Sequence, residues 1–222
     1  HAATMVNAGL YLVARLMPFV DVHHHGVSGL EDFGLIVAWI GGITAFMAAS
    51  IAFVQNDIKK VLAYSTMSQL AYIFTGLGSA LYFLNIDEYY AGYFVLGASL
   101  FHLFNHAMAK GMLFMASGSV IHEVHHAHDH LHHGSDHGDH DFDPQDMRNM
   151  GGLASKLPIT ATAMMFGSMS IIGIPLIGGF WSKEGIIAKT WSAYFHGETL
   201  MLGPAILILA TAGMTGFYMS RM

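Results

Sequence analysis

Long uninterrupted apolar runs limit this chain to one kind of fold. The run 34–54, GLIVAWIGGITAFMAASIAFV, holds no charged residue, and roughly 20 apolar residues suffice for a helix to cross a bilayer. Lipid offers no hydrogen-bond partners to backbone groups, so such runs form helices rather than loops. The sequence therefore predicts an all-α membrane protein with about six transmembrane helices. The other expected spans are 2–20, 61–83, 93–121, 159–180 and 200–219.

The composition agrees with this fold class. The chain is 54% hydrophobic and 11% charged, whereas about 25% of the residues of a soluble domain are charged. There is no cysteine, so neither disulfides nor a thiolate metal site is predicted. The net charge is −6, and seven of the fifteen acidic residues lie in 123–146. No basic surface for nucleic acid is present, and the lipid bilayer is the expected surrounding.

Positive charges in the connecting segments predict an orientation. Lys59 lies between the second and third runs, Arg148 lies in the segment 122–156, and Arg221 follows the last run. The positive-inside rule places these three segments on the cytoplasmic side, which agrees with six crossings. Because the chain starts at His1 within an apolar run and has no initiator methionine, we expect it to be an internal piece of a longer protein.

Three parts follow from this pattern: four helices in 1–121, a cytoplasmic loop in 122–156, and a broken helix plus one further helix in 157–222. Nine of the sixteen histidines lie in the loop, within 122–140. A tract of such low complexity does not build a packed core and is predicted to be disordered. A solvated insertion is the favoured interpretation, with weak binding of Zn²⁺ or Ni²⁺ by the His122–His140 loop as the alternative.

The fifth apolar run contains helix-breaking residues. SIIGIPLIGGFWSKEG places Gly173, Pro175, Gly178 and Gly179 within it. Proline removes a helix hydrogen bond and glycine loosens the turn. A break inside a membrane is tolerated only beside protein or water, and transporters build ion sites from such breaks. A broken helix and a simple proline kink are both compatible with this pattern.

Lys183 and Glu184 follow this break directly. They are expected either to form a polar group near the far membrane face or to be an ordinary ion pair at the membrane interface.

Three protonatable residues lie within the fourth run. His102, His106 and Lys110 are spaced i, i+4, i+8, so on a helix they lie within roughly 80° of one another over about 12 Å. Charge at the bilayer centre costs at least about 2.5–3.5 kcal/mol, so the stripe should face the bundle interior or water. A hydrogen-bonded core histidine or a snorkelling lysine explains one such residue but not three in register. The spacing predicts a proton or ion pathway.

The residue types favour protons. Imidazole titrates near neutral pH, and a desolvated lysine loses much of its preference for the charged form. Carriers about 6 Å apart along a helix need hydroxyls or water between them. Tyr64, Ser68 and Tyr72 have the same spacing on the third run and are candidates, although simple packing also explains each tyrosine.

Four motifs resemble one family. HAATMVNAGLYLVAR, NDIKKVLAYSTMSQLAYIFTGLG, FHLFNHAMAKGMLFMASGSVI and QDMRNMGGLASKLPIT with GIPLIGGFWSKEGII are similar to the antiporter-like subunits of respiratory complex I. They most resemble the distal L-type subunit, which also occurs in archaeal Fpo-type dehydrogenases. The resemblance implies part of a 14-helix-type fold with two inverted repeats, each containing a broken helix. It also implies proton-relay roles for His1, His102, His106, Lys110, Lys183 and Lys59.

The implied function is a subunit of a redox-driven proton translocase of the NADH:quinone oxidoreductase type in the inner or plasma membrane. The resemblance implies no cofactor in this chain, with flavin, iron–sulfur clusters and quinone in partner subunits. The implied partners are other membrane-arm subunits, above all the neighbouring antiporter-like subunit. The closest alternative is the large subunit of a multisubunit Na⁺/H⁺ (Mrp-type) antiporter.

Two further classes stay open. A metal transporter would fit the His-rich loop, but Lys110 would repel a dication and the fourth run contains no carboxylate. A membrane scaffold without transport is distinguished by Lys110→Ala and His106→Ala in the full-length complex, because a scaffold would retain full proton pumping per electron.

Overall fold

All regular elements of the described chain are helical. The computed structural model describes residues 5–20, 32–132 and 142–222, and within them the only β-structure is an isolated bridge between Asp57 and Asp146. The all-α prediction is confirmed. The elements are α1 (Asn7–Val20), α2 (Phe33–Val54), α3 (Ile58–Asn85), α4 (Tyr89–His132), η1 (Met147–Asn149), η2 (Leu153–Ser155), α5 (Pro158–Ile172), α6 (Gly178–Phe195), η3 (Thr199–Met201) and α7 (Leu202–Arg221).

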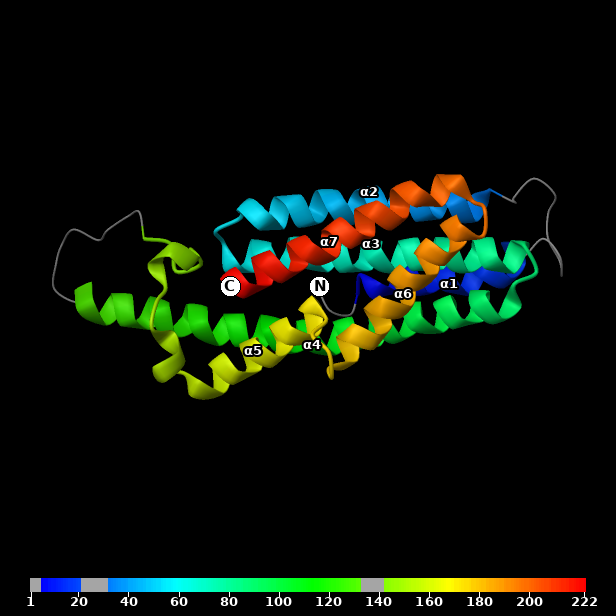
Figure 1. Ribbon diagram of the computed structural model, residues 1–222. Coiled ribbons are helices and arrows are strands. Elements are labelled where there is room, and N and C mark those ends of the chain that lie inside the picture. The colour runs from blue at the N-terminus through cyan, green and yellow to red at the C-terminus, as the bar shows by residue number, and fades with distance from the viewer. Residues whose placement is uncertain (1–4, 21–31, 133–141) are drawn as a thin grey trace.

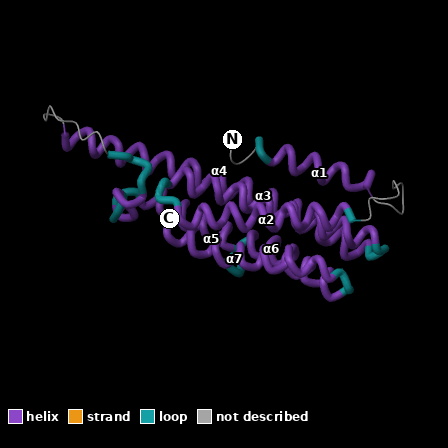
Figure 2. Tube along the Cα trace, turned by 90° about the horizontal axis from the view of Figure 1, so that it is seen from above, coloured by secondary structure: helices purple, strands orange, loops and turns teal. Residues whose placement is uncertain are grey.

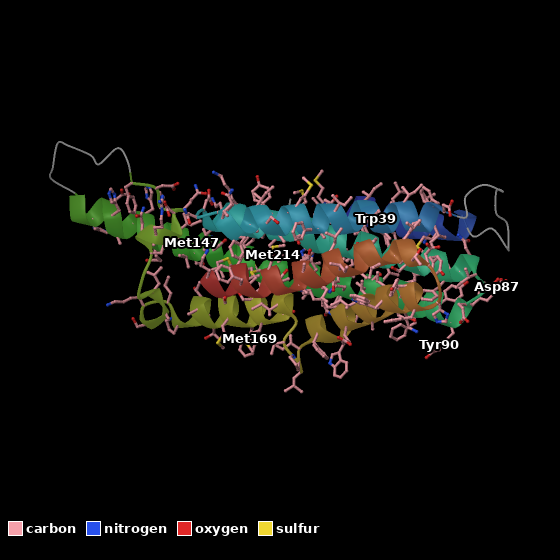
Figure 3. All side chains as sticks on the ribbon, turned by 45° about the horizontal axis from the view of Figure 1, so that its top comes forward. Trp39, Asp87, Tyr90, Met147, Met169 and Met214 are labelled. Atoms are coloured by element: carbon pink, nitrogen blue, oxygen red, sulfur yellow. The ribbon has the colours of Figure 1, made fainter. Side chains whose placement is uncertain are left out.

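Helix α3 forms the centre of an elongated bundle. It packs against α1, α2, α4, α6 and α7, and the helices run side by side along one direction (Figure 1). Seen from above, α1 lies at one edge and α7 at the opposite side of α3 (Figure 2). Figure 3 shows Met147 near one end of the bundle, and Asp87 of the α3–α4 turn and Tyr90 at the start of α4 at the other end. The faces of α3 are therefore almost all enclosed by protein.

Small residues bring α2 and α3 into close contact. A Cβ atom built on Gly41 of α2 would lie 2.7 Å from the Ala71 carbonyl oxygen, and one on Gly34 would lie 2.8 Å from the Gly78 oxygen. Small residues at such contacts let helix backbones approach closely, which is the usual packing mode in membranes. Since α3 carries several of the polar side chains described below, this contact fixes their depth in the bundle.

Within the described residues, three segments are long and apolar enough to cross a membrane: Phe33–Val54, Ile58–Asn85 and Thr199–Arg221. Pro158–Ile172 is a shorter apolar helix. The remaining expected spans correspond to α1, to the longer and more polar α4, and to the pair α5–α6.

Helix α4 is longer than the hydropathy pattern indicated. It continues from His122 to His132, so the first part of the predicted loop is helical rather than disordered, and it projects beyond the other helices (Figure 1). The sequence has no glycine or proline between Gly118 and Gly134, and His125 pairs with Asp129 one turn later at 3.1 Å. The histidines at 133–140 lie outside the described residues.

The break in the fifth run is present and separates two helices. Helix α5 ends at Ile172 and is capped by Gly173, whose φ of +86° is a left-handed conformation that glycine adopts without strain. Helix α6 begins at Gly178 and runs to Phe195, well beyond the predicted end of the run at Phe180. The two helices follow one another along α4, and each packs against it (Figure 1).

The segment after the histidine run returns to the start of α3. Met147 N–H donates to the Asn56 oxygen at 2.9 Å, and Ile58 N–H donates to the Gln145 oxygen at 3.0 Å. Between these bonds, Arg148 Nε donates to both Asp146 carboxylate oxygens at 3.0 Å. These hydrogen bonds hold the pKa of Asp146 below its ordinary value.

We expect Asp146→Asn to loosen this junction. A carboxylate with a lowered pKa stabilises the folded arrangement above its unfolded pKa, and the contribution is lost as the pH falls through the folded value. Because the pair is exposed, amide exchange at Ile58 and Met147 should rise only a few fold. Hydrogen exchange of the full-length protein measures this, with Lys156→Gln as the control; equal protection in both variants would contradict it.

Candidate functional site

The protonatable stripe of α4 faces the bundle interior. His102, His106 and Lys110 are 1%, 1% and 0% exposed, whereas Phe104 and Met108 on other faces of the same helix are 63% and 65% exposed. This is the orientation expected from their spacing. The three protonatable side chains therefore lie inside the helical bundle and do not face lipid.

His102 is held at both ring nitrogens. Its Nδ1 lies 2.8 Å from the Ser182 hydroxyl of α6, and its Nε2 lies 3.1 Å from Gln69 Oε1 of α3. The imidazole therefore links three helices through side chains alone.

A hydrogen-bonded chain continues from Gln69 to α7. Gln69 Nε2 donates to Thr215 Oγ1 at 3.3 Å. Tyr218 OH lies 3.3 Å from Thr215 Oγ1 and 3.1 Å from Ser65 Oγ. All of these side chains are fully buried, so the chain is a structural network rather than a solvated surface patch.

Lys110 ends the stripe at a carbonyl group. Its Nζ donates to the Leu62 oxygen of α3 at 3.1 Å, and Leu62 O also accepts the Thr66 hydroxyl at 2.9 Å. An ammonium group has three donors. One carbonyl from the protein satisfies only part of this capacity.

Lys183 is bound at the break itself. Its Nζ donates to the Ile171 oxygen at 2.6 Å and lies 3.5 Å from the Ile172 oxygen. These carbonyls end α5, where a helix leaves backbone oxygens without intrahelical partners and carries partial negative charge. Lys183 is 4% exposed, and Glu184 points to the exposed side of α6. Lys183 is thus a buried group of the bundle, which corrects the interpretation of this pair as an interfacial ion pair.

His102, His106, Lys110 and Lys183 together form a buried line of protonatable groups, here called the axis. Several buried polar atoms near the axis have no protein partner. Among the described residues these include both ring nitrogens of His106, Tyr72 OH, Ser99 Oγ and Asn105 Nδ2. Buried polar groups of this kind ordinarily bind water. His106, between His102 and Lys110, is therefore suited to exchange protons through water rather than through a fixed side chain.

The tyrosine and serine candidates of α3 behave differently from one another. Tyr72 is fully buried, with its ring centroid 5.9 Å from that of His102 and 5.7 Å from Lys183 Nζ. Ser68 instead donates to the Ala45 oxygen of α2 at 3.0 Å, and Tyr64 packs against an apolar cluster. Of these three residues, Tyr72 is the one whose ring lies beside both His102 and Lys183.

The remaining predicted residues lie apart from this cluster. Lys59 is exposed at the start of α3 and lines a surface hollow with His122, His125 and His126. Within the described residues no three histidine or carboxylate groups are placed to hold a metal ion. His1 lies outside the described residues.

The sequence did not predict that Gln69, Ser182, Thr215 and Tyr218 belong to the buried hydrogen-bond network around His102. The weak signal that was available is the position of buried polar residues within apolar runs: Gln69 falls one residue after Ser68, and Thr215 and Tyr218 interrupt the last run. Their pairing across helices depends on the helix register, which spacing along one helix does not reveal.

Comparison with known proteins gives consistent matches. A family profile described as NADH:quinone oxidoreductase/Mrp antiporter, TM, matches residues 2–208. NAD(P)H-quinone oxidoreductase chain 5 of Picosynechococcus is 43% identical over 224 residues, which cover all of this chain and 28% of that relative. The chloroplastic subunit 5 of Zygnema circumcarinatum is 43% identical over 225 residues, covering all of this chain and 26% of the relative. The chain thus spans about a quarter of these relatives.

One solved structure has the same fold over nearly the whole chain. A chain of the membrane-bound sulfane sulfur reductase, an archaeal respiratory membrane complex, superposes with a TM-score of 0.69. The sequence identity is 27%, and the match covers 99% of this chain and 37% of that chain.

Proposed function

We propose that this chain, which belongs to the NADH:quinone oxidoreductase/Mrp antiporter membrane family, is part of an L-type subunit. The subunit moves protons across a membrane. In this proposal it serves a redox-driven complex of the NADH:quinone oxidoreductase type. The chain itself carries out no redox chemistry, and it lies in the inner or plasma membrane as a multi-pass subunit.

The observation that carries the proposal is the burial of four proton-exchanging groups in one helical bundle. His102, His106 and Lys110 of α4 and Lys183 of α6 are each at most 4% exposed. No carboxylate hydrogen bonds or ion pairs to these groups are found among the described residues. Structural stability alone does not favour unpaired buried amines, because their desolvation is costly. Reversible protonation is the function that uses them.

In the proposed mechanism, charge changes elsewhere in the complex shift proton occupancy along the axis. Proton transfer between neighbouring buried groups changes the cost of charging the next one, because the low local dielectric makes their repulsion strong. Lys110 and Lys183 hold protons at backbone carbonyls, and His102 and His106 accept and release them between these ends. Lys59 and His1 are proposed as outer connections of this route.

The proposed partners are the neighbouring antiporter-like subunit and the other membrane-arm subunits. Flavin, iron–sulfur clusters and quinone belong to partner subunits in this proposal and supply the electron transfer. The named relatives, which are quinone oxidoreductase subunits, favour this reading over the Na⁺/H⁺ antiporter alternative.

The test uses the complete complex reconstituted in vesicles. We expect proton uptake to begin on adding the electron donor and to stop with an inhibitor of electron transfer. Replacing Na⁺ with K⁺ should leave the rate unchanged. Exchange of Na⁺ for H⁺ without any donor would instead identify an antiporter and overturn the proposal.

A further inference from the structure

The side-chain amide of Gln69 hydrogen bonds to His102 at one end and to Thr215 at the other. The starting point is Thr215. Its hydroxyl donates to the Thr211 oxygen at 2.8 Å, so its single proton is engaged and its oxygen accepts hydrogen bonds from other groups.

The acceptor role of Thr215 orients the amide of Gln69. The end of the Gln69 amide that lies 3.3 Å from Thr215 Oγ1 has to donate, so it is the NH₂ group. The other end of the amide, Oε1, therefore faces His102 Nε2 at 3.1 Å. An amide oxygen accepts only, so His102 Nε2 carries a proton.

This assignment leaves Nδ1 as the basic nitrogen of the neutral ring. A neutral imidazole has one N–H, so the lone pair is at Nδ1 and accepts the Ser182 hydroxyl at 2.8 Å. Ser182 belongs to α6, the second half of the broken helix, and is next to Lys183.

We propose that Gln69 is a positioning residue that fixes His102 in the Nε2–H tautomer and makes Nδ1, on the α6 side, the atom that takes up and returns protons. The inference rests on the proposed function and adds to it the direction from which one relay group is used.

The proton transfer balances at Nδ1 without breaking the bond at Nε2. An incoming proton bonds to the Nδ1 lone pair and gives the imidazolium. Ser182 then turns its own proton toward the Gly179 or Gly178 oxygen, at 3.2 and 3.3 Å, and its oxygen accepts the new N–H. When the proton leaves Nδ1, Ser182 turns back. The Nε2 proton stays, because an amide oxygen is a far weaker base than imidazole.

The other titratable groups around His102 belong to helices α3, α4, α6 and α7. They are His106 and Lys110 on α4, Tyr72 on α3, Lys183 on α6, and Tyr218 on α7 behind Thr215. The variants proposed below keep all of these titratable side chains. Thr215→Val also removes one of the two hydrogen-bond partners of Tyr218 OH, which keeps the other, Ser65 Oγ.

The experiment measures protons pumped per electron against pH in the complete complex. In Gln69→Glu, a carboxylate of nearly the same shape stabilises the imidazolium, so the neutral accepting form appears only at higher pH. We expect the pH of half-maximal pumping to rise by about one to three units. Thr215→Val removes the anchor of the amide, weakens the acceptor at Nε2 and should move the midpoint down.

Thr75→Val is the matched control. Thr75 is a fully buried residue of α3 whose hydroxyl reaches only backbone oxygens in the described contacts, at 3.4 Å, and its variant should keep the wild-type midpoint. Opposite shifts in Gln69→Glu and Thr215→Val support the inference, and an unchanged midpoint in an assembled variant overturns it. If Gln69→Glu does not assemble, Thr215→Val decides alone. The proposed function fails on a different result, namely full pumping without Lys110.

Discussion

Lys110→Met is expected to reduce the number of protons pumped per electron by about tenfold or more in the complete complex, while electron transfer stays measurable. Methionine preserves most of the volume of this fully buried side chain, so packing against α3 is largely kept. What the variant loses is the exchangeable proton and its bond to the Leu62 oxygen. Vesicles with parallel readings of donor oxidation and proton uptake measure the ratio.

Lys110→Arg separates charge from proton exchange. Arginine keeps the positive charge and the donor to Leu62 O but does not release its proton in proteins, so pumping should fall nearly as far as in Lys110→Met. Lys189→Met is the matched control, because Lys189 is a half-exposed residue of α6 whose Nζ lies 5.7 Å from the Phe94 ring centroid. A purely structural Lys110 would behave differently: arginine would then restore pumping.

The sequence predicted those features that depend on one helix at a time. The spacing of His102, His106 and Lys110 identifies a polar face of α4 because the periodicity of a helix is fixed, and the burial of all three follows from the cost of exposing charge to lipid. The position of the break follows equally from Gly173 and Pro175, whose backbone requirements are local.

Features that depend on two helices together were not predictable. Hydropathy falls after Phe180, which suggested that the span ended there. Helix α6 instead continues as an amphipathic helix, with Lys183 and Thr190 inside and Glu184 outside. The carbonyl of Ile171 that binds Lys183 becomes available only because α5 ends beside it. The partnership of Gln69 with His102 likewise needs the register of α3 against α4.

Gly179→Ala is expected to have the largest effect on stability. A Cβ atom at this position would overlap the backbone oxygen of Ser170 in α5, and backbone atoms have no alternative rotamer. The two halves of the broken helix would have to separate, at a cost of about 1–3 kcal/mol or more. Lys183, one turn further along α6, would lose its bond to Ile171 O. The yield of assembled complex and its thermal midpoint should both fall.

Two other glycines provide graded controls for this prediction. A Cβ at Gly178 would lie 2.9 Å from Asn105 Oδ1, the end of a side chain that can move, and one at Gly213 of α7 would have nothing within 4 Å. We therefore expect a mild effect for Gly178→Ala and a neutral or slightly stabilising one for Gly213→Ala, since alanine favours helix over glycine. Equal stability of the Gly179 and Gly213 variants would contradict the close contact of the two half-helices. The expected order requires that backbone contact, not helix propensity, holds the carbonyl end of α5 against Lys183, because propensity alone would make all three substitutions stabilising.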